Sequence, residues 1–253
     1  MAVSGIAELI NNMLTGDGKS LAQLISLAEN DPTSPEILEL LRRHEGKACY
    51  IGITGPPGAG KSTLIDRLVT RIRHRGLSVG IIGVDPSSPI SGGAVLGDRV
   101  RMQQHYLDDG VFIRSMASRG YHGGLANAVE VVAGLLAASG KDIVIIETVG
   151  TGQTEVGIAQ IASVLILVLV PESGDAIQAL KAGIAELADI IVINKADREG
   201  AEGLADEFRA AELQSHPRNE PAVIATQAIN DVGIEELFQE IYRRCEASRL
   251  KVR

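Results

Sequence analysis

A short stretch near position 60 has the residue types and spacing of a phosphate-binding loop. Residues 55–63 read Gly-Pro-Pro-Gly-Ala-Gly-Lys-Ser-Thr and fit the pattern G-x-x-x-x-G-K-[ST] at every fixed position. Glycines let a backbone approach phosphates closely, and successive N–H groups at a helix N-terminus attract the anion. We expect Lys61 to reach the β- and γ-phosphates and Ser62 to ligate Mg²⁺. The residues predicted to contact nucleotide here are Gly55, Pro57, Gly58, Ala59, Gly60, Lys61, Ser62 and Thr63.

Acidic residues at the ends of apolar segments form a second set of candidates. The segment 143–146 runs directly into Glu147, and Gly150 follows three residues later. This arrangement places a carboxylate near the Mg²⁺ shell and a glycine N–H against the γ-phosphate; most such sites use Asp, and Glu147 has a longer reach. Asp85 ends another apolar segment, and Asp98 follows a glycine-rich stretch. Both are candidate metal ligands, although a turn or helix-cap role stays open for them.

A third motif predicts recognition of guanine. Asn194-Lys195-Ala196-Asp197 follows the apolar segment 190–193 and fits the pattern N-K-x-D. Asp197 can accept hydrogen bonds from the guanine ring N–H and exocyclic amine, Lys195 can lie over the base, and Asn194 can brace the loop. A site built for such bonds rejects bases that lack them. Thr226, Gln227 and Ala228 are candidates for the last loop over the base, with an ordinary loop an equally open alternative.

The segments that position these motifs alternate between strand and helix. Most expected strands are continuous apolar runs, as in a parallel sheet that is covered on both faces. We therefore predict an α/β P-loop NTPase fold with a largely parallel sheet and helices on both faces. A short N-terminal helical extension, residues 1–44, precedes the P-loop domain, residues 45–253; Pro35 begins a helix there with Ser34 as its cap. The expected strands are 48–54, 78–84, 111–115, 142–147, 163–170, 189–193 and 222–226, and the expected crossover helices are 61–75, 98–107, 124–139, 176–187, 199–215 and 233–249.

Composition argues against several other classes of protein. The 253 residues carry a formal net charge of −8 and only 3% aromatic residues, which disfavours a nucleic-acid footprint. The longest apolar run, 164–170, is too short to span a bilayer, and the first ten residues lack a basic signal region. Cys49 and Cys245 form neither a disulfide framework nor a Cys-x-x-Cys metal site, and Cys49 reads as a small core residue. We expect a cytoplasmic protein that binds neither nucleic acid nor membrane.

Five blocks of this sequence can be compared with those of known proteins: GITGPPGAGKSTLID, VDPSSPISGGAVLGDRVRM, SRGYHGGLANA, ETVGTGQTEV and ELADIIVINKAD. The phosphate loop alone occurs in many unrelated proteins, so the blocks are more specific together than singly. Together they resemble one family, the MeaB/ArgK P-loop GTPases associated with methylmalonyl-CoA mutase. The resemblance covers roughly residues 48 to 245, and the blocks occur in the family's order.

The resemblance implies a partner as well as a nucleotide. Proteins of this family are chaperones for adenosylcobalamin-dependent acyl-CoA mutases, in cofactor loading, protection or reactivation. No histidine of this chain has an Asp two residues before it, as the cobalamin-binding signature of mutases requires, so the cofactor should belong to the partner. The family's third switch matches residues 171–181, with Asp175 and Lys181 as its polar ends. A homodimer is possible, although the family's longer C-terminal arm is not matched before Arg253.

The expected reaction is Mg²⁺-dependent attack of water on the γ-phosphate of GTP, with catalysis by positioning and charge neutralisation. The predicted catalytic residues are Lys61, Glu147 and Gln153, and the predicted metal ligands are Ser62, Asp85, Asp98 and Glu147. Thr151 follows Gly150 where many GTPases have Gln, so the water-positioning residue is open. Arg99, Arg101 and Arg119 are candidates for an arginine finger.

Three alternatives remain at this point. A nickel-insertion GTPase of the same superfamily would need a cluster of His or Cys residues, whereas the five histidines are scattered. A small-molecule kinase or transport ATPase is disfavoured by the motif at 194–197, which a comparison of GDP and ADP in thermal shift would test. A module that holds nucleotide without turnover would show no single-turnover hydrolysis.

Overall fold

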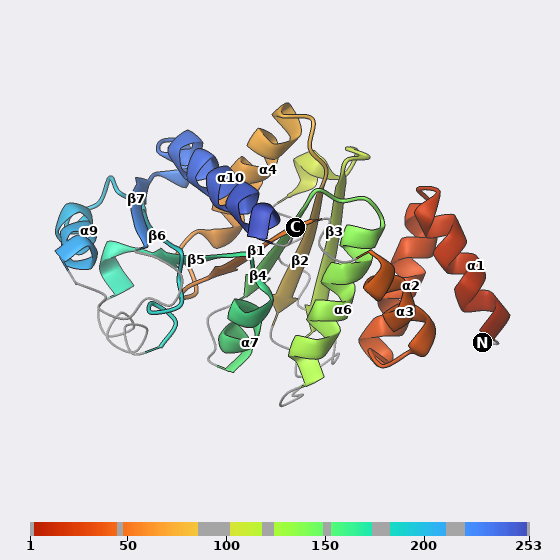
Figure 1. Cartoon of the computed structure of the whole chain (residues 1–253). Coiled ribbons are helices and arrows are strands. Elements are labelled where there is room, and N and C mark those ends of the chain that lie inside the picture. Colours follow the sequence, from red (N-terminus) through yellow and green to blue (C-terminus); the bar gives the residue numbers. More distant parts are fainter. Residues whose placement is uncertain are drawn as a thin grey trace, which may run out of the picture.

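The computed structural model describes residues 3–44, 48–85, 102–117, 124–148, 153–173, 183–210 and 221–251. Within these ranges, seven strands form one sheet in the order β3-β2-β4-β1-β5-β6-β7 (Figure 1). Every neighbouring pair is parallel, so the carboxyl ends of the strands meet at one edge of the sheet. Each strand was predicted to within two residues, and the P-loop NTPase fold class is confirmed. The strands are β1 (Cys49–Thr54), β2 (Val79–Asp85), β3 (Val111–Ala117), β4 (Ile143–Thr148), β5 (Val164–Leu169), β6 (Ile190–Asn194) and β7 (Ala222–Thr226).

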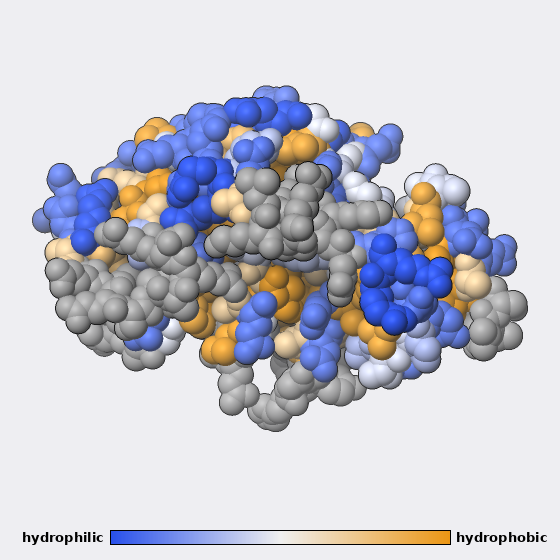
Figure 2. Space-filling model, viewed as in Figure 1, coloured by the Kyte–Doolittle hydropathy of each residue, from blue (hydrophilic) through white to orange (hydrophobic). Residues whose placement is uncertain are grey.

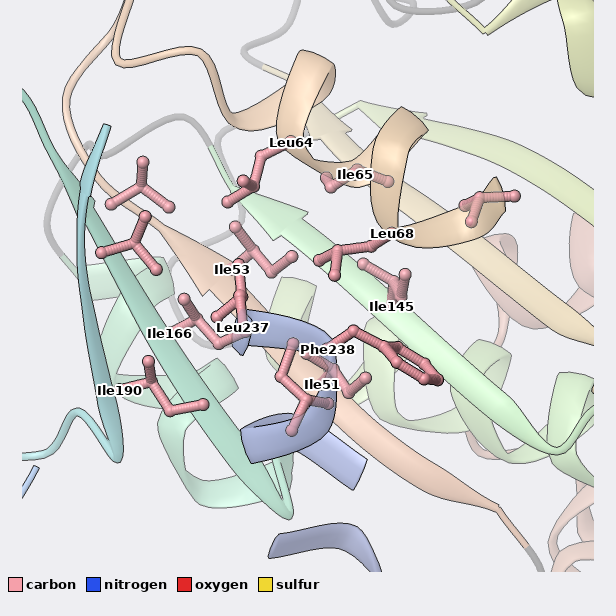
Figure 3. Packing of buried hydrophobic residues seen from close by; sticks show 14 of the residues in the cluster. Ile51, Ile53, Leu64, Ile65, Leu68, Ile145, Ile166, Ile190, Leu237 and Phe238 are labelled. Carbon is pink, nitrogen blue, oxygen red and sulfur yellow. The ribbon is translucent and has the colours of Figure 1, made fainter. Parts of the chain in front are cut away.

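Helices cover both faces of the sheet (Figure 1). On one face, α4 (Lys61–His74) and α10 (Ile234–Lys251) pack on the central strands. Figure 3 shows this layer, in which Leu64 and Leu68 of α4 lie with Phe238 of α10 over the strand residues. On the other face lie α6 (Gly124–Ala138), α7 (Gln153–Ile161) and α9 (Ala201–Ala210). The strands β4, β5 and β6 are buried along their whole length, which explains why their sequences are continuously apolar.

Three N-terminal helices, α1 (Val3–Leu14), α2 (Gly18–Asn30) and α3 (Pro35–Arg43), lie beside α6 (Figure 1). Their buried residues join those of α6, β2 and β4 in one hydrophobic cluster. A bidentate ion pair also connects α2 to β3, because Nε and Nη2 of Arg114 each donate to a carboxylate oxygen of Glu29 at 2.7 Å. The helical extension therefore shares a core with the sheet. Pro35 begins α3 as predicted, but the Ser34 side chain does not cap it and instead donates to Glu36 at 3.0 Å.

Three helix predictions need correction or addition. Residues 102–107, inside the expected helix 98–107, form only the single turn η1 (Gln103–His105). Tertiary contacts fix this turn, because Gln104 donates to Asp66 of α4 at 2.6 Å and His105 Nε2 lies 3.1 Å from the same carboxylate. Residues 183–187 form a turn at the end of the expected helix 176–187, whose earlier residues lie outside the described ranges. Helix α7 was not predicted, because its sequence lacks a clear apolar stripe.

The two cysteines form a disulfide, which the sequence interpretation missed. Cys49 opens β1 and Cys245 lies in α10, and their Cα atoms are 5.7 Å apart across a sequence separation of 196 residues. Cys49 is buried, as expected of a core residue, but a separation this long gives no local signal of pairing. No helix in the described part of the chain has the length and apolar character needed to cross a lipid bilayer.

Candidate functional site

The phosphate-binding motif occupies the turn between β1 and α4, as predicted. Two of its glycines are required by the fold. A Cβ at Gly55 would lie 2.1 Å from the carbonyl oxygen of Val168 in β5, and a Cβ at Gly60 would lie 2.4 Å from Nδ2 of Asn194. Both have positive φ, 142° and 90°, which L-residues with side chains rarely adopt. The loop is therefore pressed against β5 and against the residue that opens the guanine motif.

Lys61 is the first residue of α4, and its side chain is only 6% exposed. Its Nζ donates to the carbonyl oxygens of Gly55 at 2.9 Å and Pro56 at 3.1 Å. The Lys61 ammonium is therefore hydrogen-bonded to the phosphate loop itself. Gly60 occupies the N-cap of α4 and has no side chain with which to cap the helix. The N-terminus of α4 directly follows the glycine loop, and the partial positive charge of a helix N-terminus suits an anion.

Ser62, directly after Lys61, contacts Glu147 at the end of β4. The Ser62 hydroxyl donates to Oε1 of Glu147 at 2.9 Å, although 85 residues separate them. Each side chain is 5% exposed. The contact arises because β4 lies next to β1 in register, so the end of β4 reaches the start of α4. An alcohol and a carboxylate oxygen buried together are hard oxygen donors, and this donor set fits Mg²⁺.

The remaining predicted metal and catalytic residues are only partly described. Asp85 is the last residue of β2, next to β4 in the sheet, and Gln153 is the first residue of α7. The other residues of this set lie outside the described ranges. They are Asp98, Arg99, Arg101, Arg119, Gly150, Thr151, Asp175 and Lys181.

Asn194, at the end of β6, joins three loops. It is 2% exposed, and its Nδ2 donates to the carbonyl oxygen of Ala59 at 2.8 Å. Its Oδ1 accepts from the Thr226 hydroxyl and from the backbone N–H of Ala228, each at 3.1 Å. The amide therefore connects the phosphate loop, the guanine motif and the loop after β7. These bonds agree with the expectation that Asn194 braces its loop. They also connect Asn194 to two other loops, which the sequence did not suggest.

The rest of the guanine motif lies at the surface. Lys195 is half-buried with a left-handed backbone, φ 57°, and Asp197 is exposed. The backbone N–H of Ala196 donates to the carbonyl oxygen of Thr226 at 3.0 Å, so the motif and the loop after β7 are neighbours. Gln227 is half-buried and its N–H donates to the carbonyl of Val232 at 3.0 Å. Thr226 and Ala228 thus contact the predicted guanine motif, and Gln227 lies between them in the chain.

Replacing Asn194 with alanine should lower both stability and nucleotide affinity. The substitution removes three buried hydrogen bonds and leaves the Ala59 and Ala228 backbone groups unpaired, at a cost of roughly 2–4 kcal/mol. For a chain of this size we expect the melting temperature to fall by about 5–15 °C. Thermal unfolding with and without GDP measures both effects. Asn230→Ala, an exposed asparagine on the neighbouring turn, is the matched control and should shift melting by less than about 2 °C.

Two supports of the site were not predicted. Arg67 of α4 donates to the carbonyl oxygens of Ala228 at 3.2 Å and Ile229 at 3.1 Å, and Arg71 donates to Asp231 at 2.5 Å. The signal in the sequence was the spacing of four residues, which puts both arginines on one side of the helix.

The second support joins the guanine motif to the residues after β5. Arg198, directly after Asp197, donates to Glu172, and this hydrogen bond lowers the pKa of Glu172. No local pattern indicates this pairing, because the two residues lie in loops after different strands.

Similar proteins indicate the family to which this chain belongs. Residues 21–251 match the family described as "Methylmalonyl Co-A mutase-associated GTPase MeaB". A Pyrococcus abyssi protein named as a candidate GTPase is 50% identical over 242 residues, which cover 93% of this chain and 75% of that protein. GTPase ArgK of Escherichia coli is 34% identical, over 93% of this chain and 75% of its own length. A fused isobutyryl-CoA mutase of Cupriavidus metallidurans is 37% identical over 91% of this chain, which corresponds to 22% of that protein.

Solved structures support the same assignment. A structure described as an LAO/AO transport system kinase has 27% identity and a TM-score of 0.72, covering 99% of this chain and 81% of that one. The nickel complex of HypB from Helicobacter pylori, at 16% identity and a TM-score of 0.58, covers 85% of this chain and 95% of its own and supports the fold alone. The resemblance to the MeaB/ArgK proteins is therefore confirmed. This chain belongs to the methylmalonyl-CoA mutase-associated GTPase family, MeaB, and is a P-loop GTPase that converts GTP and water to GDP and phosphate.

Proposed function

We propose that this GTPase serves as a chaperone of an adenosylcobalamin-dependent acyl-CoA mutase, in cofactor loading, protection or reactivation. The observation that carries the proposal is that a homologous segment lies within a mutase polypeptide, the fused isobutyryl-CoA mutase. The family description, which names association with methylmalonyl-CoA mutase, supports the same partner class. Both observations support a complex in which this chain contributes the GTPase activity and the mutase binds the cobalamin.

The proposed nucleotide contacts follow the order of the loops along the sheet edge. The loop at residues 55–63 would hold the phosphates through its N–H groups and Lys61, and Gly150 would add an N–H at the γ-phosphate. Asp197 would read the guanine edge, and Lys195 would cover the base. The loop at 226–228 would close over the base, held in place by Asn194. The hydrogen bonds of Lys61 and Asn194 support these assignments, as do the parallel strands that bring the described loops together, whereas Gly150 is assigned from the sequence alone.

The proposed metal site centres on Ser62 and Glu147, with Asp85 and Asp98 as further candidates. When bound, Mg²⁺ would neutralise charge on the β- and γ-phosphates. Glu147 accepts a hydrogen bond from the Ser62 hydroxyl at 2.9 Å, so the two oxygens are close enough that both would ligate one cation. Both groups are buried, which keeps bulk water from competing for these oxygens.

During hydrolysis, the chain's own residues would act mainly by positioning. Lys61 would leave the Gly55 and Pro56 carbonyls to follow the negative charge on the phosphates. Gln153, at the start of α7 near the end of β4, is the proposed group that orients the attacking water. We expect slow intrinsic turnover that rises when a partner orders the switch segments. Arg99, Arg101 and Arg119, the candidates for an arginine finger, lie outside the described residues.

This proposal is tested by measuring GTP hydrolysis with purified acyl-CoA mutases. We expect the methylmalonyl- or isobutyryl-CoA enzyme, holding its cobalamin, to raise kcat at least tenfold at saturating concentration. An unrelated CoA-dependent enzyme of similar charge is the control and should leave the rate unchanged. Rates that stay within twofold for every acyl-CoA mutase, together with no association in gel filtration, would contradict the mutase partner while leaving the GTPase assignment intact.

The remaining expectations belong to the same proposal. We place the protein in the cytoplasm and allow that it works as a homodimer. The nickel-insertion alternative is supported only by fold similarity to HypB. Within the described residues, no group of three or more His, Cys, Asp or Glu side chains could hold a metal ion.

A further inference from the structure

The C-terminal half of α10 is held at the edge of the sheet opposite the predicted nucleotide site. Cys245 is bonded to Cys49 at the first residue of β1, whereas the phosphate loop follows the last residue of that strand. The neighbouring Arg244 lies with its Nη1 3.8 Å from Oδ1 of Asp189, just before β6. Both cysteines are buried, with 2% and 5% exposure. One covalent bond and one ion pair, on adjacent residues, therefore attach this end of the helix.

The N-terminal half of α10 is attached differently. Leu237 and Phe238 are buried against the central strands (Figure 3), and the Arg75 guanidinium lies 5.4 Å from the centre of the Phe238 ring. Arg71 Nε lies 3.4 Å from Glu235 in the first turn. In Figure 2, hydrophilic residues cover much of the outer side of the molecule where α10 and α4 lie. These contacts of the N-terminal half are non-covalent, and it borders the loop at 226–228.

An apolar cavity adjoins the disulfide. It is lined by side chains of β1, β4, α4 and α10, and Cys245 forms part of its wall. The helix is therefore not closely packed on the sheet beside Cys245, and the disulfide supplies part of its attachment there. The lining residues are Ile51, Leu68, Ile72, Ile143, Ile145, Phe238, Ile241, Tyr242 and Cys245.

We propose that the Cys49–Cys245 disulfide is a redox-controlled latch on α10. When the bond is formed it fixes the helix to β1, and when it is reduced the last turns, residues 242–251, open while the nucleotide site stays assembled. Disulfides are uncommon in reducing compartments, so the oxidation state of this pair reports on the protein's surroundings. Because the bond closes a loop of 196 residues, it constrains the unfolded chain strongly.

Formation of the latch is a thiol–disulfide exchange with a small-molecule or protein disulfide. The thiolate of one cysteine attacks that disulfide, which releases one thiol and leaves a mixed disulfide. The second thiolate then attacks the protein sulfur of the mixed disulfide and releases the other thiol. The two cysteines lose two protons and two electrons, and the exchange partner gains them. Since both sulfurs are buried, either direction requires α10 to open locally, so exchange should be slow.

The test compares oxidised and reduced forms of the full chain. The chain is first equilibrated with oxidised glutathione, then denatured and treated with a thiol-alkylating reagent. Mass spectrometry should find no alkylated thiols in this oxidised sample. It should find two in a sample that was reduced before alkylation. Verified reduction should lower the melting temperature by roughly 5–15 °C. It should also speed amide exchange in residues 242–251 and leave GDP affinity, measured well below melting, within about twofold.

The double variant Cys49→Ala/Cys245→Ala controls for other effects of reductant. Its melting temperature should not respond to reductant, and it should resemble the reduced parent. Two free thiols that persist in the parent after oxidation would overturn the proposal, as would a melting temperature that verified reduction does not change. Loss of GDP binding on reduction would also overturn it, because the structural change would then extend to the nucleotide site. If the double variant does not fold, reduction of the parent chain decides the matter alone.

Discussion

Replacing Lys61 with alanine is expected to reduce the rate of GTP hydrolysis by about 10²–10³-fold. The buried ammonium is held by two carbonyls of the phosphate loop, so it stands where charge on the β- and γ-phosphates must be neutralised. GDP affinity should fall by a smaller factor, because GDP lacks the γ-phosphate and does not form the transition state that Lys61 would stabilise. Single-turnover hydrolysis and a GDP titration separate the two effects.

Lys19→Ala is the matched control for this experiment. Lys19 is exposed on α2, far from the phosphate loop along the chain, and its removal should change neither rate nor affinity. Circular dichroism should show that both variants keep the fold. A Lys61→Ala protein that folds normally and hydrolyses GTP within threefold of the parent rate would show that Lys61 does not act on the transferred phosphoryl group.

The second large effect is expected at Asp197. In Asp197→Asn, the carboxylate that would accept two N–H groups of guanine becomes an amide that can accept only one. Two charge-assisted bonds are worth about 3–6 kcal/mol, so GDP should bind roughly 10²–10⁴-fold more weakly. Xanthine carries a carbonyl where guanine carries its amine, so the new amide N–H can donate to it. We therefore expect the variant to prefer XDP to GDP, as measured by direct titration.

Glu199→Gln provides the control for Asp197. It makes the same chemical change two residues away on the same exposed loop, so loss of surface charge alone is accounted for. Its affinity for GDP should stay within twofold of the parent. Equal binding of GDP and ADP by the parent chain would refute the assignment of the base-reading carboxylate, whatever the variant does.

Short-range pattern was sufficient for most of the fold. The apolar runs that became β4, β5 and β6 are buried on both faces, and such runs have few other stable arrangements. Where local pattern and tertiary contacts disagreed, the contacts prevailed. Residues 102–107 look helical, yet Gln104 and His105 turn towards Asp66 of α4, so the helix does not form there.

By itself, the sequence determined the identity of the candidate site: a phosphate loop, an acid at a strand end and a guanine motif, in an order that fits one family. It did so because backbone geometry and base recognition restrict the residue types within a few consecutive positions. Only the tertiary structure decided which distant residues meet, such as Ser62 with Glu147, Asn194 with Ala59 and Ala228, and Cys49 with Cys245. Those contacts depend on the order of strands in the sheet, and that order is set by the packing of the whole chain.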